Sequence, residues 1–60
     1  MLTDPQFKII ESAMPYVTAI RFPINSGDDM RLEYEVSGFK YVEIYDTEGE
    51  LIGYGGRMPL

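Results

Sequence analysis

The spacing of hydrophobic residues changes near residue 15. Before this point they recur at intervals of three and four, which is the spacing of one face of an α-helix. Thr3 followed by Gln6 has the form of a capping box, and Pro15 disfavours helical backbone at the residue before it. The pattern predicts a helix over residues 4–14. Its expected buried face consists of Phe7, Ile10, Ala13 and Met14.

From Val17 onward the hydrophobic positions alternate, as in strands with one buried face. Alternation and the intervening turn residues predict four strands, over residues 17–24, 30–36, 40–46 and 50–55. Short loops would join them into an antiparallel meander with the helix packed on one face. The expected fold class is therefore α+β, with residues 1–60 forming one small domain.

Strand register decides which side chains are buried, because a slip of one residue turns a strand over. We expect a five-residue loop at 25–29 and three-residue loops at 37–39 and 47–49. A two-residue Ser37-Gly38 loop is rejected, because it would place Glu43 beside Leu32 in the core. The expected core under the helix is Ile20, Phe22, Leu32, Tyr34, Val36, Val42, Ile44, Ile52 and Tyr54.

The same register places three glutamates on the outer face of the sheet. Glu33 would lie directly opposite Glu43, with Glu35 beside them, and like charges in such positions destabilise a sheet by up to about 1 kcal/mol. An apolar patch of the kind found at protein interfaces would lie next to them, formed by Tyr41, Tyr45 and Leu51. A solvated face on which Arg21 offsets the repulsion is the ordinary alternative.

A meander also brings the 25–29 and 47–49 loops to one end of the sheet. Five carboxylates would gather there: Asp28, Asp29, Asp46, Glu48 and Glu50. Turn chemistry accounts for Asp28 and Asp46 but leaves the other three unexplained. The 46–50 segment lacks the later bidentate glutamate of a calcium-binding loop, so we expect no metal site.

Composition excludes several classes of function. The chain has 60 residues, ten acidic and five basic, for a net charge of −5, which argues against direct binding to nucleic acid. It contains no histidine or cysteine, so it lacks the usual zinc ligands and the usual activated nucleophiles. We therefore expect no enzyme, no catalytic residues and no cofactor.

The longest uncharged run, residues 12–20, is too short to span a membrane, and the N-terminal sequence lacks the pattern of a signal peptide. A cytoplasmic protein is expected, in the host cytoplasm if a phage encodes it. A chain of this size has a marginal core, so a monomer or a small homo-oligomer is expected.

These features favour a protein that mimics nucleic acid, with carboxylates in place of phosphates in the basic cleft of a nucleic-acid enzyme. Two alternatives stay open. One is a different phage inhibitor of a nucleic-acid-binding protein, such as an anti-CRISPR protein. The other is a structural or assembly module whose outer sheet face meets a partner.

Two segments resemble the phage uracil-DNA glycosylase inhibitors. Residues 10–15, Ile-Glu-Ser-Ala-Met-Pro, resemble the Glu-Ser motif of that family, and residues 40–58 resemble its C-terminal hairpin, in which an apolar strand runs into an acidic turn ending in glycine. The resemblance implies that Glu11 and Ser12 contact the DNA-binding cleft of uracil-DNA glycosylase. It also implies that a cavity between helix and sheet captures a leucine of the enzyme; its candidate lining here is Met14, Leu32 and Ile44.

Together, the charge pattern and the resemblance give a single set of candidate partner-binding residues. They are Glu11, Ser12, Asp28, Asp29, Glu33, Glu35, Tyr41, Glu43, Tyr45, Glu48 and Leu51.

Overall fold

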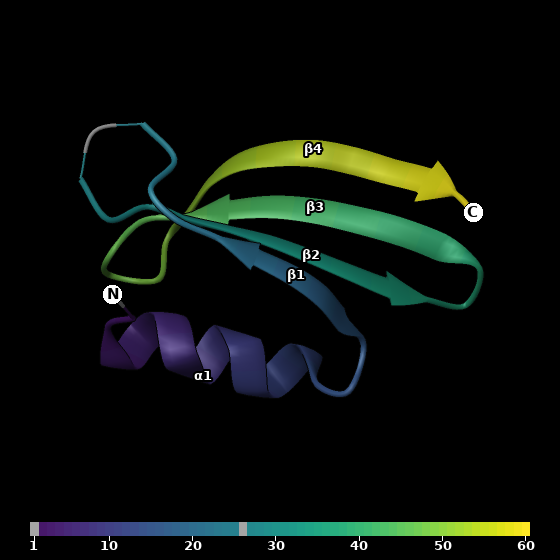
Figure 1. Cartoon of the computed structure of the whole chain (residues 1–60), viewed down its shortest axis with the longest axis horizontal. Helices are drawn as coiled ribbons and strands as arrows, with labels where there is room; N and C mark the ends of the chain where they lie inside the picture. The colour runs from purple at the N-terminus through teal and green to yellow at the C-terminus, as the bar shows by residue number, and fades with distance from the viewer. Residues whose placement is uncertain (1, 26) are drawn as a thin grey trace.

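The computed structural model describes residues 2–25 and 27–60, and it consists of one helix packed on a four-stranded sheet (Figure 1). Its elements are α1 (Asp4–Ala13), β1 (Val17–Arg21), β2 (Met30–Val36), β3 (Phe39–Tyr45) and β4 (Leu51–Pro59). The strands form an antiparallel meander in the order β1-β2-β3-β4. The predicted α+β fold class is confirmed.

Helix α1 begins at the predicted capping box. The Thr3 hydroxyl accepts a hydrogen bond from the Gln6 N–H, and the Gln6 side chain accepts one from the Thr3 N–H. The helix ends at Ala13, one residue before the predicted end, because Met14 adopts extended backbone (φ −69°, ψ 144°) ahead of Pro15.

The buried face of α1 differs from the predicted one. Gln6 and Ile10 are buried, whereas Phe7 and Met14 are 50% and 59% exposed. The hydrophobic pattern misplaced this face because it assigned a polar residue to the solvent. Gln6 is buried without penalty because every polar atom of its side chain forms a hydrogen bond.

The turn between β2 and β3 has two residues, which contradicts the predicted three-residue loop. Val36 pairs with Phe39, and both intervening residues have positive φ, 54° at Ser37 and 80° at Gly38, as in a type I′ turn. The shorter loop turns β3 over relative to the prediction. Leu32 is therefore opposite Glu43, the pairing that the sequence argument rejected.

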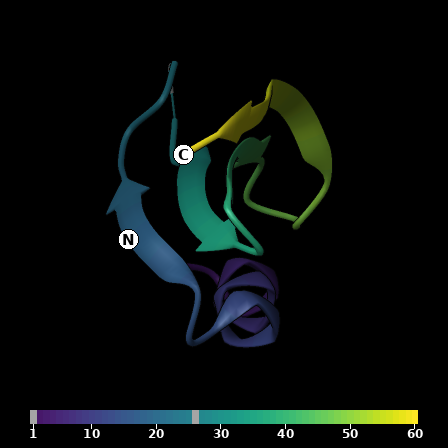
Figure 2. The same ribbon diagram turned by 90° about the vertical axis from the view of Figure 1, so that its right-hand side faces the viewer.

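Helix α1 contacts β2, and β4 curves away from it on the far side of the sheet (Figure 2). The central core is small and consists of Ile10, Met30 and Leu32, with partly buried hydrophobic residues around it. Three residues predicted to be in the core are instead 40–58% exposed: Ile20, Ile52 and Tyr54. They lie in the two edge strands, to which the single helix gives little cover.

Pairing at the edges follows the prediction only in part. Strand β1 ends at Arg21, so the predicted extension to residue 24 is wrong, and Ile20 pairs with Leu32 where Tyr34 was expected. The predicted turn at 46–49 is confirmed by the pairing of Tyr45 with Leu51 and by a φ of 84° at Gly49. Irregular pairing then changes the register, and β4 continues to residue 59.

Close packing explains two glycines of β4. A Cβ atom on Gly55 would lie 2.9 Å from the Val42 Cβ, and one on Gly53 would lie 3.2 Å from the Ile44 Cδ1. Val42 and Ile44 were both predicted to face the helix. They face the opposite side of the sheet instead, because β3 is turned over.

Candidate functional site

Glu33 is a buried carboxylate surrounded by three basic side chains. Arg21 Nε and Arg31 Nη1 lie 3.3 and 3.0 Å from Oε2, and Lys40 Nζ lies 3.2 Å from Oε1. The hydrogen bond from Lys40 is the main factor that lowers the pKa of Glu33; Arg21 and Arg31 act in the same direction, and burial opposes them. Glu33 is therefore neutralised within the chain.

Glu43 lies on the helix side of the sheet, where its carboxylate accepts hydrogen bonds from two tyrosine hydroxyls. Tyr45 donates a hydrogen bond of 2.7 Å to Oε1, and Tyr34 donates one of 3.0 Å to Oε2. Burial, together with the hydrogen bond to the carboxylate, raises the pKa of Tyr34 to about 12, and the same causes raise the pKa of Tyr45. Both hydroxyls thus remain protonated donors well above neutral pH.

The predicted outer surface of three crowded glutamates does not form. Glu33 is opposite Val42, and Glu43 is opposite Leu32 on the other face of the sheet. Glu35 shares the face of Glu33 and pairs across the strands with Lys40. The predicted crowding and repulsion of these three side chains on one face is therefore wrong.

The predicted tyrosine patch is also rearranged. The Tyr41 ring stacks on Tyr34, with ring centroids 4.9 Å apart, and the Tyr45 hydroxyl is bonded to Glu43. Both tyrosines lie on the same face as Glu43, and only Leu51 is exposed, at 54%. These residues do not form an apolar surface beside Glu33.

The acidic loops do lie together, at the N-terminal end of α1 (Figure 1). The Gln6 Nε2 group donates hydrogen bonds to the backbone oxygens of Asp28 (2.8 Å) and Asp46 (3.1 Å). The Thr3 hydroxyl donates another to the Thr47 carbonyl, at 2.6 Å. The start of the helix therefore fixes the backbone of both loops; Ser26 of the predicted 25–29 loop lies outside the described residues.

Six carboxylates belong to this part of the molecule, which we call the acidic end: Asp4, Asp28, Asp29, Asp46, Glu48 and Glu50. Asp46 has a structural role, because its Oδ1 accepts hydrogen bonds from the backbone N–H groups of Glu48 and Glu50. Among residues 2–25 and 27–60, every salt bridge ends on Glu33. The carboxylates of the acidic end therefore have no salt-bridge partner within the described residues.

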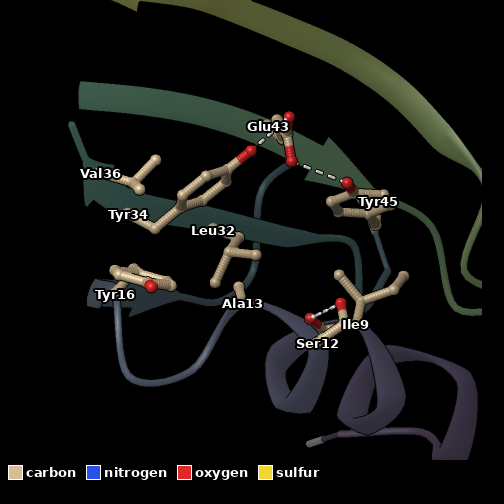
Figure 3. Close-up of a pocket in the computed structure, with 9 residues that line it drawn as sticks. All are labelled: Ile9, Ser12, Ala13, Tyr16, Leu32, Tyr34, Val36, Glu43 and Tyr45. Carbon is tan, nitrogen blue, oxygen red and sulfur yellow. Dashed lines mark hydrogen bonds between the residues drawn. The ribbon is translucent and has the colours of Figure 1, made fainter. Parts of the chain in front are cut away.

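A cavity of about 310 Å³ lies between α1 and the sheet (Figure 3). Ile9, Ser12 and Ala13 line it from the helix, and Tyr16 lines it from the segment that follows. The sheet contributes Leu32, Tyr34 and Val36 from β2 and Glu43 and Tyr45 from β3. One charged group thus lies among apolar and aromatic walls.

The cavity only partly matches the lining that the family resemblance implies. Leu32 lines it, but Met14 is 59% exposed, and Ile44 lies on the opposite face of the sheet. Ser12 lines the cavity, and its hydroxyl donates to the Ile9 carbonyl at 2.8 Å. Glu11 is exposed on the helix, where a partner protein can reach it.

The structure brings some of the predicted partner-binding residues together at the acidic end and places others far from it. Asp28, Asp29 and Glu48 share the acidic end, whereas Glu11 and Ser12 lie in the last turns of the helix, away from it. Sequence reasoning missed Asp4 in the first group and Tyr16 in the cavity. The sequence signal for Asp4 was its place in the first helical turn; Tyr16 had no comparable signal.

Comparison with family models, with curated proteins and with solved structures found no match to this chain. Within the described residues, no three acidic side chains are grouped so that they could hold a metal ion. The one helix described is not long and apolar enough to cross a membrane.

Proposed function

We propose that this chain is an acidic inhibitor that occupies the basic DNA-binding cleft of a nucleic-acid enzyme, with uracil-DNA glycosylase as the best candidate. The observation that carries the proposal is the acidic end. It gathers six carboxylates at the start of the helix and on two loops, whose carbonyls at Asp28, Asp46 and Thr47 accept hydrogen bonds from Gln6 and Thr3. No salt bridge within the described residues neutralises them.

A cluster of carboxylates at one end of the molecule suits a basic cleft for two reasons. Its field steers the encounter with a positively charged partner and speeds association. The partner's cations also supply the counter-charges that these carboxylates lack within the described residues. Asp28, Asp29 and Glu48 are the predicted contacts that this proposal retains, and Glu33 is withdrawn because its charge is already neutralised.

The choice of uracil-DNA glycosylase rests on the family resemblance of residues 10–15 and 40–58. The cavity gives partial support, since it lies between helix and sheet, where the resemblance implies one, and Leu32 of the implied lining residues lines it. Glu11, exposed on the same helix, remains a proposed contact with the enzyme.

A uracil-excision assay with the purified enzyme tests the proposal. We expect inhibition that weakens steeply as salt rises, because binding between opposite charges is screened. Replacing Asp29 by Asn together with Glu48 by Gln should weaken inhibition by about tenfold, the equivalent of about 1.4 kcal/mol. Glu35→Gln, on the sheet, is the control and should change it little. Absence of both binding and inhibition would exclude this enzyme as the target.

The edge strand β4 favours a second candidate function, that of an assembly module. Apolar side chains that are 43–72% exposed lie along β4 and the residue after it: Leu51, Ile52, Tyr54, Met58 and Leu60. A partner chain could cover this strand or add to its free edge. Sedimentation at increasing protein concentration distinguishes the two candidates, since an assembly module would form a salt-resistant oligomer and the inhibitor would stay a monomer.

A further inference from the structure

We propose that the cavity between α1 and the sheet binds the alkyl chain and cationic end of a lysine or arginine of the partner protein. This inference rests on the proposed function, because a nucleic-acid enzyme presents such side chains in its cleft. It concerns a different part of the surface from the acidic end, and it can be tested separately.

Glu43 is the group that would meet the cation. Each of its carboxylate oxygens accepts one tyrosine hydroxyl, and a carboxylate can accept about four hydrogen bonds in total, so capacity remains for an ammonium or guanidinium donor. No salt bridge within the described residues involves Glu43, because all of them end on Glu33. The cavity therefore contains a carboxylate with no internal cation.

The walls suit the rest of such a side chain. Tyr16, Tyr34 and Tyr45 bring three aromatic rings to the cavity, and aromatic rings attract cations through their negative faces (Figure 3). Leu32 and Ala13 offer apolar surface to the methylene groups. A volume of about 310 Å³ is enough for one long side chain.

A purely apolar side chain, such as the leucine that the family resemblance implies, fits this chemistry less well. It would fill the volume but would exclude water from Glu43 without supplying a counter-charge, and burying an unpaired charge is costly. An alkyl chain that ends in a cation satisfies both the walls and the carboxylate.

Titration of the isolated protein with Nα-acetyl-lysine amide, followed by two-dimensional NMR of the amide signals, tests the proposal directly. We expect the signals of Ser12, Tyr16 and Glu43 to shift, and the arginine analogue to behave alike. Nα-acetyl-norleucine amide keeps the alkyl chain and removes the charge, and should bind about tenfold more weakly. Equal or tighter binding of norleucine, or no shift at these residues, would overturn the inference.

Variants separate the cation from the shape of the cavity. Glu43→Gln should weaken lysine binding by about tenfold, while Glu35→Gln, which removes the same charge from the opposite face of the sheet, should leave it unchanged. Because Glu43→Gln also alters the tyrosine network, Tyr16→Leu provides a second test at an exposed ring. It should weaken binding, and Tyr16→Phe, which keeps an aromatic face, should not.

Comparison with the excision assay distinguishes failure of this inference from failure of the proposed function. Inhibition of the enzyme without any binding of the lysine amide overturns the cation site and leaves the inhibitor function standing. Binding of the lysine amide without inhibition overturns uracil-DNA glycosylase as the partner and leaves the site standing.

Discussion

At the scale of single residues, two glutamates of neighbouring strands are stabilised in different ways. Glu33 is buried among Arg21, Arg31 and Lys40, whereas Glu43 accepts hydrogen bonds from the hydroxyls of two tyrosines. Hydrophobic alternation treats every glutamate as a solvent-facing position, so it predicted neither environment. The sequence does not reveal which charges have internal partners until the strand register is known.

Glu33→Gln tests the structural role of this carboxylate. We expect a loss of about 1–2 kcal/mol in the free energy of unfolding, because three partly exposed cations lose their common partner. Repulsion between Glu33 and Glu43 would have predicted the opposite sign. Glu35→Gln, on the same face of β2, is the matched control and should stay within about 0.5 kcal/mol of the original protein.

The pH dependence of stability follows from the same group. The pKa of Glu33 is lower in the folded chain than its ordinary value of 4.5, so the unfolded chain takes up the proton first as the pH falls. Its contribution is complete above 4.5 and is lost as the pH drops through the folded value. Urea unfolding at a series of pH values should therefore show a smaller acid-induced loss for Glu33→Gln than for the original protein.

At the scale of elements, helix and strands were predictable and the orientation of β3 was not. The change from helical to alternating spacing located α1 and all four strands to within a few residues. Both faces of β3 carry hydrophobic residues, Tyr41 and Tyr45 on one side and Val42 and Ile44 on the other, so alternation could not choose between them. The orientation of β3 depends on the length of the turn before it. The Ser37-Gly38 turn has two residues where three were predicted, and this difference of one residue turns β3 over.

Substitution at Ser37 tests that turn. Asn tolerates positive φ better than Ser does, so Ser37→Asn should raise the free energy of unfolding by about 0.5 kcal/mol at a φ of 54°. Ser37→Val, which places a branched side chain at the same backbone angle, should lower it by about 1–2 kcal/mol. Thermal unfolding of the two variants measures both effects; a loss of stability in Ser37→Asn would contradict a type I′ turn.

At the scale of the whole molecule, charge is unevenly distributed. Three of the five basic side chains surround Glu33, and Arg57 lies over the Phe39 ring, 4.4 Å from its centroid. Six carboxylates therefore remain concentrated at the acidic end. Loop placement made this cluster predictable, because a meander brings alternate loops to one end of the sheet. The lining of the cavity was not predictable, since it depends on the orientation of β3.

Reversing one charge at the acidic end should have opposite effects on folding and on binding. Glu48→Lys should stabilise the isolated protein by about 0.5 kcal/mol, because it relieves repulsion among exposed carboxylates. It should also weaken binding to the basic enzyme. Denaturant unfolding together with the excision assay measures both effects, and added salt should diminish the gain in stability. A less stable Glu48→Lys protein would show that the carboxylates are not in mutual repulsion.

The contacts of Gln6 suggest how this molecule could diversify. Its amide holds both acidic loops through main-chain oxygens of Asp28 and Asp46, atoms that every amino acid possesses. Exchanging the side chains at 28, 29 and 48 therefore leaves the anchoring bonds in place. Variants that face differently shaped or differently charged targets could arise on the same rigid frame, and a randomised library at these three positions should yield mostly folded proteins.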